Sequence, residues 1–320
     1  MADGFAEISR LAAAGTPFLF IVSYDKKEAI VRPIDRLGGI RFQTPSIPDT
    51  KPPASSSNLR HAILQKAPVP FETYRRAFDR IVEQIERGNT YLLNLTFSTP
   101  IETPLNLPEI FALANAPYKL LWPGRFVCFS PEPFVKIQGD RIATFPMKGT
   151  IDAAVPDAER KILADAKEMA EHVMVVDLLR NDLGIVATNV QVKRFRYIDR
   201  IEAADKTLLQ VSSHIEAKLP ADWPARLGEI LEAMLPAGSI TGTPKKRTCD
   251  IIEAVETHDR GFFTGVFGYF DGKNLESAVM IRFIEERRGE KIYKSGGGLT
   301  IDSDPWAEYQ EMIDKVYLPL

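Results

Sequence analysis

The hydrophobic positions along the chain repeat with two periods, and alternation is the more frequent. From Tyr91 to Phe97 apolar side chains alternate with more polar ones, which is typical of a strand with one buried face. Short apolar runs between turn residues predict further strands. These are expected at 18–22, 30–34, 40–42, 126–130, 134–137, 141–145, 190–197, 208–217, 265–270, 278–285 and 291–294.

Other segments repeat their apolar residues every three or four positions, which predicts amphipathic helices. In 71–87, Tyr74 and Phe78 share one face, and Gly88 supplies the stop. Short connections such as 270–274 are typical of hairpins, so the pattern predicts an α+β fold with antiparallel sheets and helices outside. Four more helices are expected at 166–181, 223–234, 244–257 and 305–316.

Prolines and serines interrupt this pattern from residue 44 to about residue 69. Such a composition resists regular structure, so we expect a linker or a meandering loop there. A chain of 320 residues is long enough for about two domains, and one large layered domain fits the same length.

Composition and charge narrow the range of functions. The 40 Lys and Arg residues against 43 Asp and Glu give a net charge of −3, so no overall positive field would collect nucleic acid or an anionic membrane. No apolar run approaches the ~20 residues that cross a bilayer. The two cysteines, Cys128 and Cys249, cannot build a disulfide framework and fit a reducing cytoplasm. We therefore expect a cytoplasmic protein that holds anionic ligands with local groups.

One expected helix carries a pair of acids of the kind that Mg²⁺ needs on a rigid support. Glu168 and Glu171 lie three positions apart and share one helix face. Asp165 and Glu168 also have the spacing of a capping box, so helix initiation explains Glu168 at least as well as a site does. Glu171 lies deeper, beside an apolar run, and has no such explanation.

A second pair, Glu308 and Glu311, lies in a helix that Asp304 caps and Pro305 begins. Glu308 suits the positive end of the helix dipole, and Glu311 has the spacing of a surface ion pair with Lys315. Spacing alone therefore leaves a metal site and ordinary helix chemistry open for both pairs.

Candidate anion-binding and catalytic groups lie in loops. Residues 236–247 enter a helix whose first turn holds three cations, starting at Lys245, where they oppose the helix dipole. The glycines 296–298 permit a ligand close to the backbone, although the residues alone favour a flexible turn. Lys148 is open between a solvated lysine and a nucleophile, and Glu132 between a surface acid and a general acid.

A series of short motifs runs in order along the chain from about residue 71 to residue 316. The motifs are Ser130-Pro-Glu132, Pro146-Met-Lys148-Gly-Thr150, Glu171-His172, 176–184, Gly238-Ser-Ile-Thr-Gly242-Thr-Pro-Lys245, 265–269, Ile281-Arg282, Gly296-Gly-Gly298, Asp302-Ser-Asp304-Pro and Glu308-Tyr-Gln-Glu311. In this order they resemble the chorismate-utilising enzymes, which include anthranilate, isochorismate, salicylate and aminodeoxychorismate synthases. The resemblance implies large antiparallel sheets packed face to face with helices outside. It also implies one compact chorismate-binding catalytic domain at 71–320, with a short strand segment and linker at 1–70 packed on it.

Lys148 points to one branch of that family. Aminodeoxychorismate synthases resemble one another in a Pro-x-Lys-Gly-Thr motif, where anthranilate synthases usually carry a small residue instead of lysine. Isochorismate and salicylate synthases place a basic lysine where this chain has Leu92. The resemblance therefore implies the reaction of component I of aminodeoxychorismate synthase, which converts chorismate and ammonia to 4-amino-4-deoxychorismate for 4-aminobenzoate and folate biosynthesis.

The resemblance also implies a role for each motif residue. Lys148 would attack C2 of chorismate to give a covalent intermediate, Glu132 would protonate the departing C4 hydroxyl, and ammonia would displace the lysine and enter C4. Mg²⁺ would be held by Glu171 and Glu311, with Glu168 and Glu308 nearby. The substrate would be bound by Thr150, Ser239, Thr241, Lys245, Arg282, Gly296, Gly297 and Gly298.

One partner subunit is expected, and two alternative functions stay open. The chain shows no amidotransferase motif, so the ammonia is expected from a separate glutamine amidotransferase subunit. Gln210 stands where the family has histidine, Phe263 stands where relatives often have tyrosine, and the segment before Phe71 is short. These departures keep open a non-catalytic chorismate-binding subunit. Anthranilate synthase component I is the other alternative, to be distinguished by its product and by Lys148.

Overall fold

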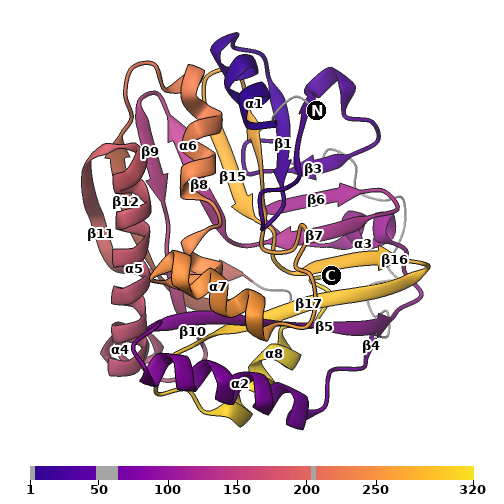
Figure 1. Ribbon diagram of the computed structural model, residues 1–320, viewed down its shortest axis with the longest axis vertical. Coiled ribbons are helices and arrows are strands. Elements are labelled where there is room, and N and C mark those ends of the chain that lie inside the picture. Colours follow the sequence, from indigo (N-terminus) through magenta and orange to yellow (C-terminus); the bar gives the residue numbers. More distant parts are fainter. Residues whose placement is uncertain (1–3, 48–63, 203–206) are drawn as a thin grey trace.

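A computed structural model describes residues 4–47, 64–202 and 207–320, and two antiparallel sheets form its centre (Figure 1). Within the described residues, the first sheet has nine strands and the second has eight. In spatial order the first sheet contains β10 (Met147–Asp152), β12 (Thr207–Lys218), β9 (Arg141–Thr144), β8 (Pro133–Gln138), β15 (Leu275–Val279), β14 (Val266–Phe270), β1 (Phe18–Val22) and β2 (Ala29–Pro33), with β11 (Thr188–Glu202) paired to β12. The second contains β13 (Gly242–Thr243), β5 (Leu92–Glu102), β17 (Glu290–Leu299), β16 (Phe283–Arg287), β7 (Phe126–Ser130), β6 (Tyr118–Trp122) and β3 (Arg41–Gln43), with β4 (Gln65–Lys66) paired to β5.

Helices lie outside both sheets. Figure 1 shows α5 and α6 along the first sheet, and α2 and α8 together below β5 and β17 of the second. The helices are α1 (Gly4–Ala13), α2 (Phe71–Glu86), α3 (Leu107–Leu113), α4 (Ala158–Ala164), α5 (Ala166–Val186), α6 (Leu227–Met234), α7 (Lys245–Val255) and α8 (Pro305–Asp314), with 3₁₀ turns η1 (Ile34–Arg36), η2 (Trp223–Arg226) and η3 (Gly238–Ile240).

Strand β1 shows how the layers are held together. All five of its residues are buried, and alternate side chains point to opposite faces. Phe18 and Phe20 join a core with α1, α5 and α6, whereas Leu19 and Ile21 join a core that both sheets share. The predicted α+β fold, with antiparallel sheets packed face to face and helices outside, is therefore confirmed.

The second sheet is covered by three helices that have apolar stripes. Ile81 of α2, Ile252 of α7 and Met312 of α8 pack with Leu95 of β5 in one core. This packing fixes α8 against β17, which carries the glycine run.

The expected strand at 278–285 is wrong, because the chain changes sheets there. Val279 ends β15 in the first sheet, and Phe283 begins β16 in the second. Between them Arg282 has a left-handed backbone, with φ of 51°, which no regular strand allows. An uninterrupted apolar pattern cannot reveal that its two halves lie in different layers.

The flexible turn that the residues alone favoured at 296–298 is also wrong. All three glycines lie inside β17 and pair with Asn94, Leu95 and Thr96 of β5. Because glycine has no side chain, another group can approach the backbone of β17 closely at these positions.

Three helices were not predicted: α1, α3 and α4. Each is short, at 7 to 10 residues, so its apolar period extends over too few turns to stand out. Of the expected linker at 44–69, residues 48–63 lie outside the described part of the chain, and β4 follows it. Over the described ranges, no helix combines the length and the hydropathy that a membrane span requires.

Candidate active site

Helices α5 and α8 both begin with an aspartate N-cap, which orients their acids. Asp165 accepts a hydrogen bond from the backbone N–H of Glu168 at 2.9 Å, and Asp304 accepts one from that of Ala307 at 2.8 Å. A side-chain cap of this kind fixes the first turn of a helix. The acids of both helices therefore extend from well-ordered turns.

The expected loop position of Lys148 is wrong, because the residue lies in strand β10, among these acids. Its Nζ lies 2.6 Å from Oε2 of Glu171, which is 5% exposed. Burial alone would lower the pKa of Lys148, but the negative charge of Glu171, reinforced by Glu168 and Glu311, raises it. The ammonium form is therefore the stable one in this arrangement. The amine becomes a nucleophile only when another partner takes up the charge of Glu171.

The same acids offer the kind of oxygen ligand that a hard divalent cation binds. Burial raises the pKa of Glu168 and of Glu308, and repulsion from Glu171 and Glu311 respectively adds to the shift. Oε2 of Glu168 is buried and has no hydrogen-bond partner. An orphaned carboxylate oxygen among further carboxylates is the donor set that Mg²⁺ prefers. As they stand, no three acids, histidines or cysteines of the described chain are grouped closely enough to hold a metal ion.

The glycine run of β17 faces the acids of α8. A side chain at Gly297 would lie 3.5 Å from Oε2 of Glu308 and 3.7 Å from Nζ of Lys315. That Nζ lies 2.6 Å from Oε1 of Glu311 and donates to the carbonyl of Gly296 at 3.0 Å. The sequence predicted only a surface ion pair for Lys315, whereas the structure adds it to the site.

Glu132 lies between β7 and β8 and keeps its proton more firmly than an ordinary glutamate. The hydroxyl of Ser239 donates a hydrogen bond to Oε1 of Glu132. Burial raises the pKa of Glu132, against the opposing effects of Ser239, Arg282 and Lys315. A carboxyl group that stays protonated above its usual range can act as a general acid.

Arg282 lies at the crossover between the two sheets. Its carbonyl accepts a hydrogen bond from the N–H of Phe129 at 3.2 Å, which holds the left-handed residue against β7. The guanidinium donates through Nε to the hydroxyl of Tyr317 at 3.3 Å and lowers the pKa of Glu132. A guanidinium with further N–H groups suits bidentate binding of a carboxylate.

The structure thus brings two groups of predicted residues together. Lys148 lies with the four glutamates and Gly297, and Glu132 lies with Ser239 and Arg282. Lys315 connects the groups, because its charge opposes the rise that burial causes in the pKa of Glu132 and lowers the pKa of Glu311.

Three predicted substrate-binding residues are placed differently. Thr150 is exposed and pairs with Gln210 across β10 and β12. The hydroxyl of Thr241 is buried and donates to the carbonyls of Ala237 and Gly238, so it serves its own turn. The third, Lys245, forms an ion pair within the protein.

Lys245 lies against Asp182 of α5. The two charged groups are 2.6 Å apart, and Nζ also donates to the carbonyl of Met234 at 2.9 Å. Asp182 is 3% exposed and belongs to a motif of the sequence that had been given no role. The pattern could not reveal this pair because its members are 63 positions apart on different helices.

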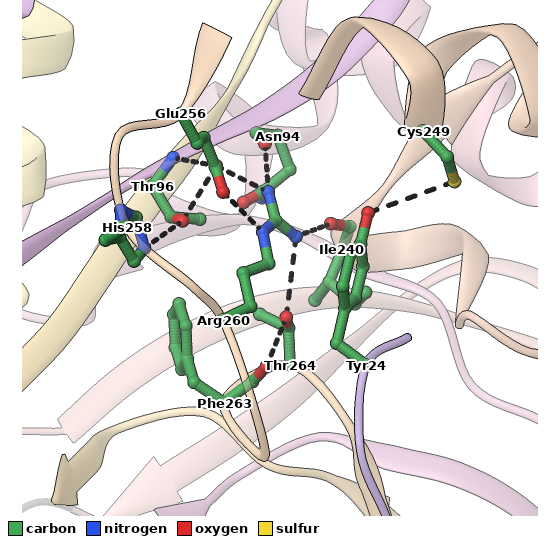
Figure 2. A network of polar contacts seen from close by, with 10 residues as sticks. All are labelled: Tyr24, Asn94, Thr96, Ile240, Cys249, Glu256, His258, Arg260, Phe263 and Thr264. Carbon is green, nitrogen blue, oxygen red and sulfur yellow. Dashed lines mark hydrogen bonds and ion pairs between the residues drawn. The ribbon is translucent and has the colours of Figure 1, made fainter. Parts of the chain in front are cut away.

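A buried network behind the site was not predicted either. Figure 2 shows Arg260 at its centre, where the guanidinium donates to the carbonyls of Asn94 at 2.7 Å and Ile240 at 2.9 Å. Its charge is balanced by Glu256, which also accepts a hydrogen bond from the backbone of Thr96. No spacing motif marks these residues, and burial of the charges is the signal that identifies them.

Comparisons with known proteins identify the family of the chain. A family model for chorismate binding enzymes matches residues 14–320. An "uncharacterized PabA-like protein" of Haemophilus influenzae is 46% identical over 307 residues, which are 95% of this chain and 93% of that protein.

Named enzymes of two kinds are more distant relatives. Anthranilate synthase component 1 of Haloarcula marismortui is 36% identical over 263 residues, 76% of this chain and 52% of that enzyme. Aminodeoxychorismate synthase component 1 of Klebsiella aerogenes is 31% identical over 335 residues, 98% of this chain and 71% of that enzyme. Both levels of identity support a shared family without choosing between the two reactions.

The fold is shared with a solved structure as well. Anthranilate synthase component I from Streptococcus pneumoniae superposes with a TM-score of 0.69 at 24% identity, covering 82% of this chain and 62% of that one. Because the family model matches almost the whole chain, the protein is a chorismate-utilising enzyme of the anthranilate and aminodeoxychorismate synthase type and belongs to the chorismate binding enzyme family.

Proposed function

We propose that the protein is component I of an aminodeoxychorismate synthase, which converts chorismate and ammonia to 4-amino-4-deoxychorismate and water. The observation that carries the proposal is the position of Lys148. Its amine lies 2.6 Å from a buried carboxylate, among the acids suited to Mg²⁺. An amine at this place offers a nucleophile to a substrate bound there.

Leu92 supports the choice of an amine over activated water. Its side chain is 7% exposed and approaches Gly298, whose added Cβ would lie 3.3 Å from Cδ1 of the leucine. A leucine has no group that removes a proton from water, so the nucleophile at this site falls to Lys148.

The charged residues of the site would bind Mg²⁺ and the two carboxylates of the substrate. Glu171 and Glu311, with Glu168 and Glu308, would hold Mg²⁺, which would bind the ring carboxylate of chorismate and withdraw electrons from the ring. Arg282 would pair with the carboxylate of the enolpyruvyl group. The open backbone at Gly297 leaves room for the substrate beside α8.

In the reaction, Glu132 donates and accepts the proton, and Lys148 forms the covalent bond to the ring. The neutral amine of Lys148 attacks C2, both ring double bonds shift, from C1=C2 and C5=C6 to C1=C6 and C4=C5, and the C4–O bond breaks as Glu132 gives its proton to the hydroxyl, which leaves as water. Ammonia attacks C4, both double bonds shift back, and the C2–N bond breaks to release Lys148. The surplus proton of the new amine returns to Glu132, so the cycle closes.

A separate glutamine amidotransferase subunit would supply the ammonia, and ammonium salts replace it in the test. Incubating the chain with chorismate, Mg²⁺ and ammonium should yield 4-amino-4-deoxychorismate, identified by liquid chromatography and mass spectrometry. Chelation of Mg²⁺ should abolish the product. Formation of anthranilate with pyruvate would contradict the proposal in favour of the second candidate, and the absence of turnover at saturating ammonium would indicate a non-catalytic subunit.

A further inference from the structure

The turn that carries Ser239 lies between α6 and β13 and determines how the general acid is contacted. Ser239 is the middle residue of η3, and its hydroxyl donates to Glu132. No helix or long strand contains this serine, so its position depends on what holds the turn.

One side of the turn is pressed against α5. A Cβ added to Gly238 would lie 2.9 Å from Oδ2 of Asp182 and 2.9 Å from Cγ of Leu178, so the backbone approaches the helix as closely as glycine allows. Burial raises the pKa of Asp182, against the opposing effects of Lys245 and of the nearby N–H of Gly238. Oδ2 of Asp182 is buried and has no hydrogen-bond partner. Asp182 therefore contacts the residue that directly precedes Ser239.

Lys245 favours the charged form of this carboxylate and so opposes the effect of burial. It lies 2.6 Å from Oδ1 of Asp182, with 20% of its own side chain and 4% of that of Asp182 exposed. A carboxylate in such surroundings without a cation would take up a proton or draw in water, and either change would move the backbone of Gly238.

The other side of the turn has its own support. Arg260 donates to the carbonyl of Ile240 at 2.9 Å (Figure 2), and the N–H of Asn94 donates to the carbonyl of Thr241 at 2.8 Å. The end that follows Ser239 is thus fixed by residues that do not contact Asp182. The end before it is joined to Thr241 through the carbonyls of Ala237 and Gly238, and it packs against Asp182, which Lys245 pairs.

Lys245 has no direct electrostatic path to the acid. The groups that face the carboxyl group of Glu132 are Ser239 of η3, Arg282 of the crossover and Lys315 after α8, and the charge of Lys245 is already paired with Asp182. Any effect of Lys245 on Glu132 therefore passes through the turn.

We propose that Asp182 and Lys245 are positioning residues for the general acid, a buried ion pair that holds the Gly238–Ser239 turn so that the Ser239 hydroxyl donates to Glu132. This assignment rests on the proposed role of Glu132 and replaces direct substrate binding as the function of Lys245. The pair acts without touching chorismate.

The test follows the titration of Glu132 by ¹³C NMR in protein labelled at the glutamate carboxyl carbon, with the signal assigned by Glu132→Gln. Ser239→Ala should raise the pKa of Glu132 by about one unit, because a hydrogen bond to the charged form is lost. Lys245→Met should also raise the pKa of Glu132. The double variant Lys245→Met/Ser239→Ala should have the same pKa of Glu132 as Ser239→Ala alone. Lys246→Met, in the same helical turn but with a side chain that is 95% exposed, should leave it unchanged.

Asp182→Asn provides an independent route to the same shift if Lys245→Met does not fold. The inference is overturned if Lys245→Met and Asp182→Asn leave the pKa of Glu132 at its wild-type value while the proteins remain folded by near-ultraviolet circular dichroism. It is also overturned if the shifts of Lys245→Met and Ser239→Ala add. A rise in KM for chorismate without any shift of the pKa would assign Lys245 to direct substrate binding. Because the titration needs no substrate, it decides the positioning role even if the wild-type protein forms no aminodeoxychorismate, which would contradict the proposed function alone.

Discussion

Burial acts in opposite ways on the two residues that carry the proposed chemistry. It raises the pKa of Glu132, which keeps a proton ready for the leaving hydroxyl, whereas Lys148 is kept charged by Glu171 until that carboxylate is otherwise engaged. Both groups therefore begin protonated, Glu132 because of burial and Lys148 because of the charge of Glu171, and substrate and metal must change only the state of Lys148 before it attacks.

Replacing Glu132 should remove the acid and its pH dependence together. Glu132→Gln keeps the shape and the contact with Ser239 but has no proton to give, so we expect kcat to fall by about 10²- to 10⁴-fold. In the wild type, kcat/KM should decline as the pH rises through the pKa of Glu132, and this decline should be absent from the residual activity of the variant. A steady-state pH profile of both proteins measures the difference, and an unchanged profile would assign the acid elsewhere.

The raised pKa of Glu132 also has a consequence for stability. The folded chain holds a proton that the unfolded chain releases near the usual pKa of 4.5, so the contribution of Glu132 is present below that pH and is lost as the pH rises through the folded-state pKa. At neutral pH Glu132→Gln should therefore be at least as stable as the wild type. Urea denaturation at pH 5 and pH 8 tests this, and a variant that is less stable at pH 8 would contradict it.

Lys148 should compete with Mg²⁺ for Glu171. Lys148→Met removes the ammonium group 2.6 Å from the carboxylate, so Mg²⁺ should bind several-fold more tightly while synthesis of aminodeoxychorismate is lost. Isothermal titration calorimetry measures the affinity. The matched control is Lys167→Met, which should change the affinity less. The ammonium group of Lys167 is 4.0 Å from Glu171, and its side chain is 51% exposed. Weaker Mg²⁺ binding by Lys148→Met would contradict the competition.

At the scale of residues, the sequence predicted the acids, Lys148 and Glu132 because their motifs are short and ordered. The ion pair of Glu311 with Lys315 was predicted as well, but the place of Lys315 beside Gly296 and the buried Asp182 were not, since spacing along the chain does not show what lies across from a side chain. Only the packing of α8 on β17 and of η3 on α5 shows where these two charges lie.

At the scale of elements, strand β17 shows that neighbouring glycines serve different purposes. A Cβ at Gly296 would lie 2.2 Å from the carbonyl oxygen of Leu95, whereas one at Gly297 would meet only side-chain ends, the nearest at 3.5 Å. Gly296 is required by the pairing of β17 with β5, and Gly297 by the space beside the acids.

The two alanine variants should therefore separate stability from binding. Gly296→Ala should lower the free energy of unfolding by about 1–3 kcal/mol or more, because a backbone must move. Gly297→Ala should fold with stability within about 0.5 kcal/mol of the wild type but raise KM for chorismate. Thermal or urea unfolding together with steady-state kinetics measures both effects. A larger loss of stability for Gly297→Ala than for Gly296→Ala would contradict this interpretation.

The long helices and most of the longer strands were predicted because each repeats its pattern over several residues, whereas β6, β10 and the two-residue strands β4 and β13 were missed. The break at Arg282 was not predicted, since Val279 and Phe283 are equally apolar although they lie in different sheets. Helix α1 was missed for a different reason, because it is short and its stability comes from packing on α6.

At the scale of the whole molecule, Arg260 ties the two sheets together. Its guanidinium contacts Asn94 of the second sheet and lies over the ring of Tyr24, which follows β1 of the first. Glu256 balances the charge, with 3% of its side chain exposed. The network in Figure 2 therefore stabilises the relation between layers on which the site depends.

Removing one charge of this pair should destabilise the whole fold. Glu256→Gln leaves a buried guanidinium without its anion and should lower the free energy of unfolding by about 3–5 kcal/mol. Arg260→Met combined with Glu256→Gln should recover part of the loss, because no buried charge then remains unpaired. Urea denaturation of both variants gives the result, and a loss below about 1 kcal/mol for Glu256→Gln would show that water reaches the site.

The central claim is that Lys148 becomes covalently bonded to the ring of chorismate. Incubation with chorismate and Mg²⁺ without ammonium, followed by acid quenching, should give an intact protein mass increased by chorismate minus water. Peptide mapping should place the adduct on Lys148, ammonium should discharge it to aminodeoxychorismate, and Lys148→Ala should form none. Turnover to aminodeoxychorismate by Lys148→Ala at the wild-type rate, or formation of anthranilate by the wild type without any adduct, would contradict the account.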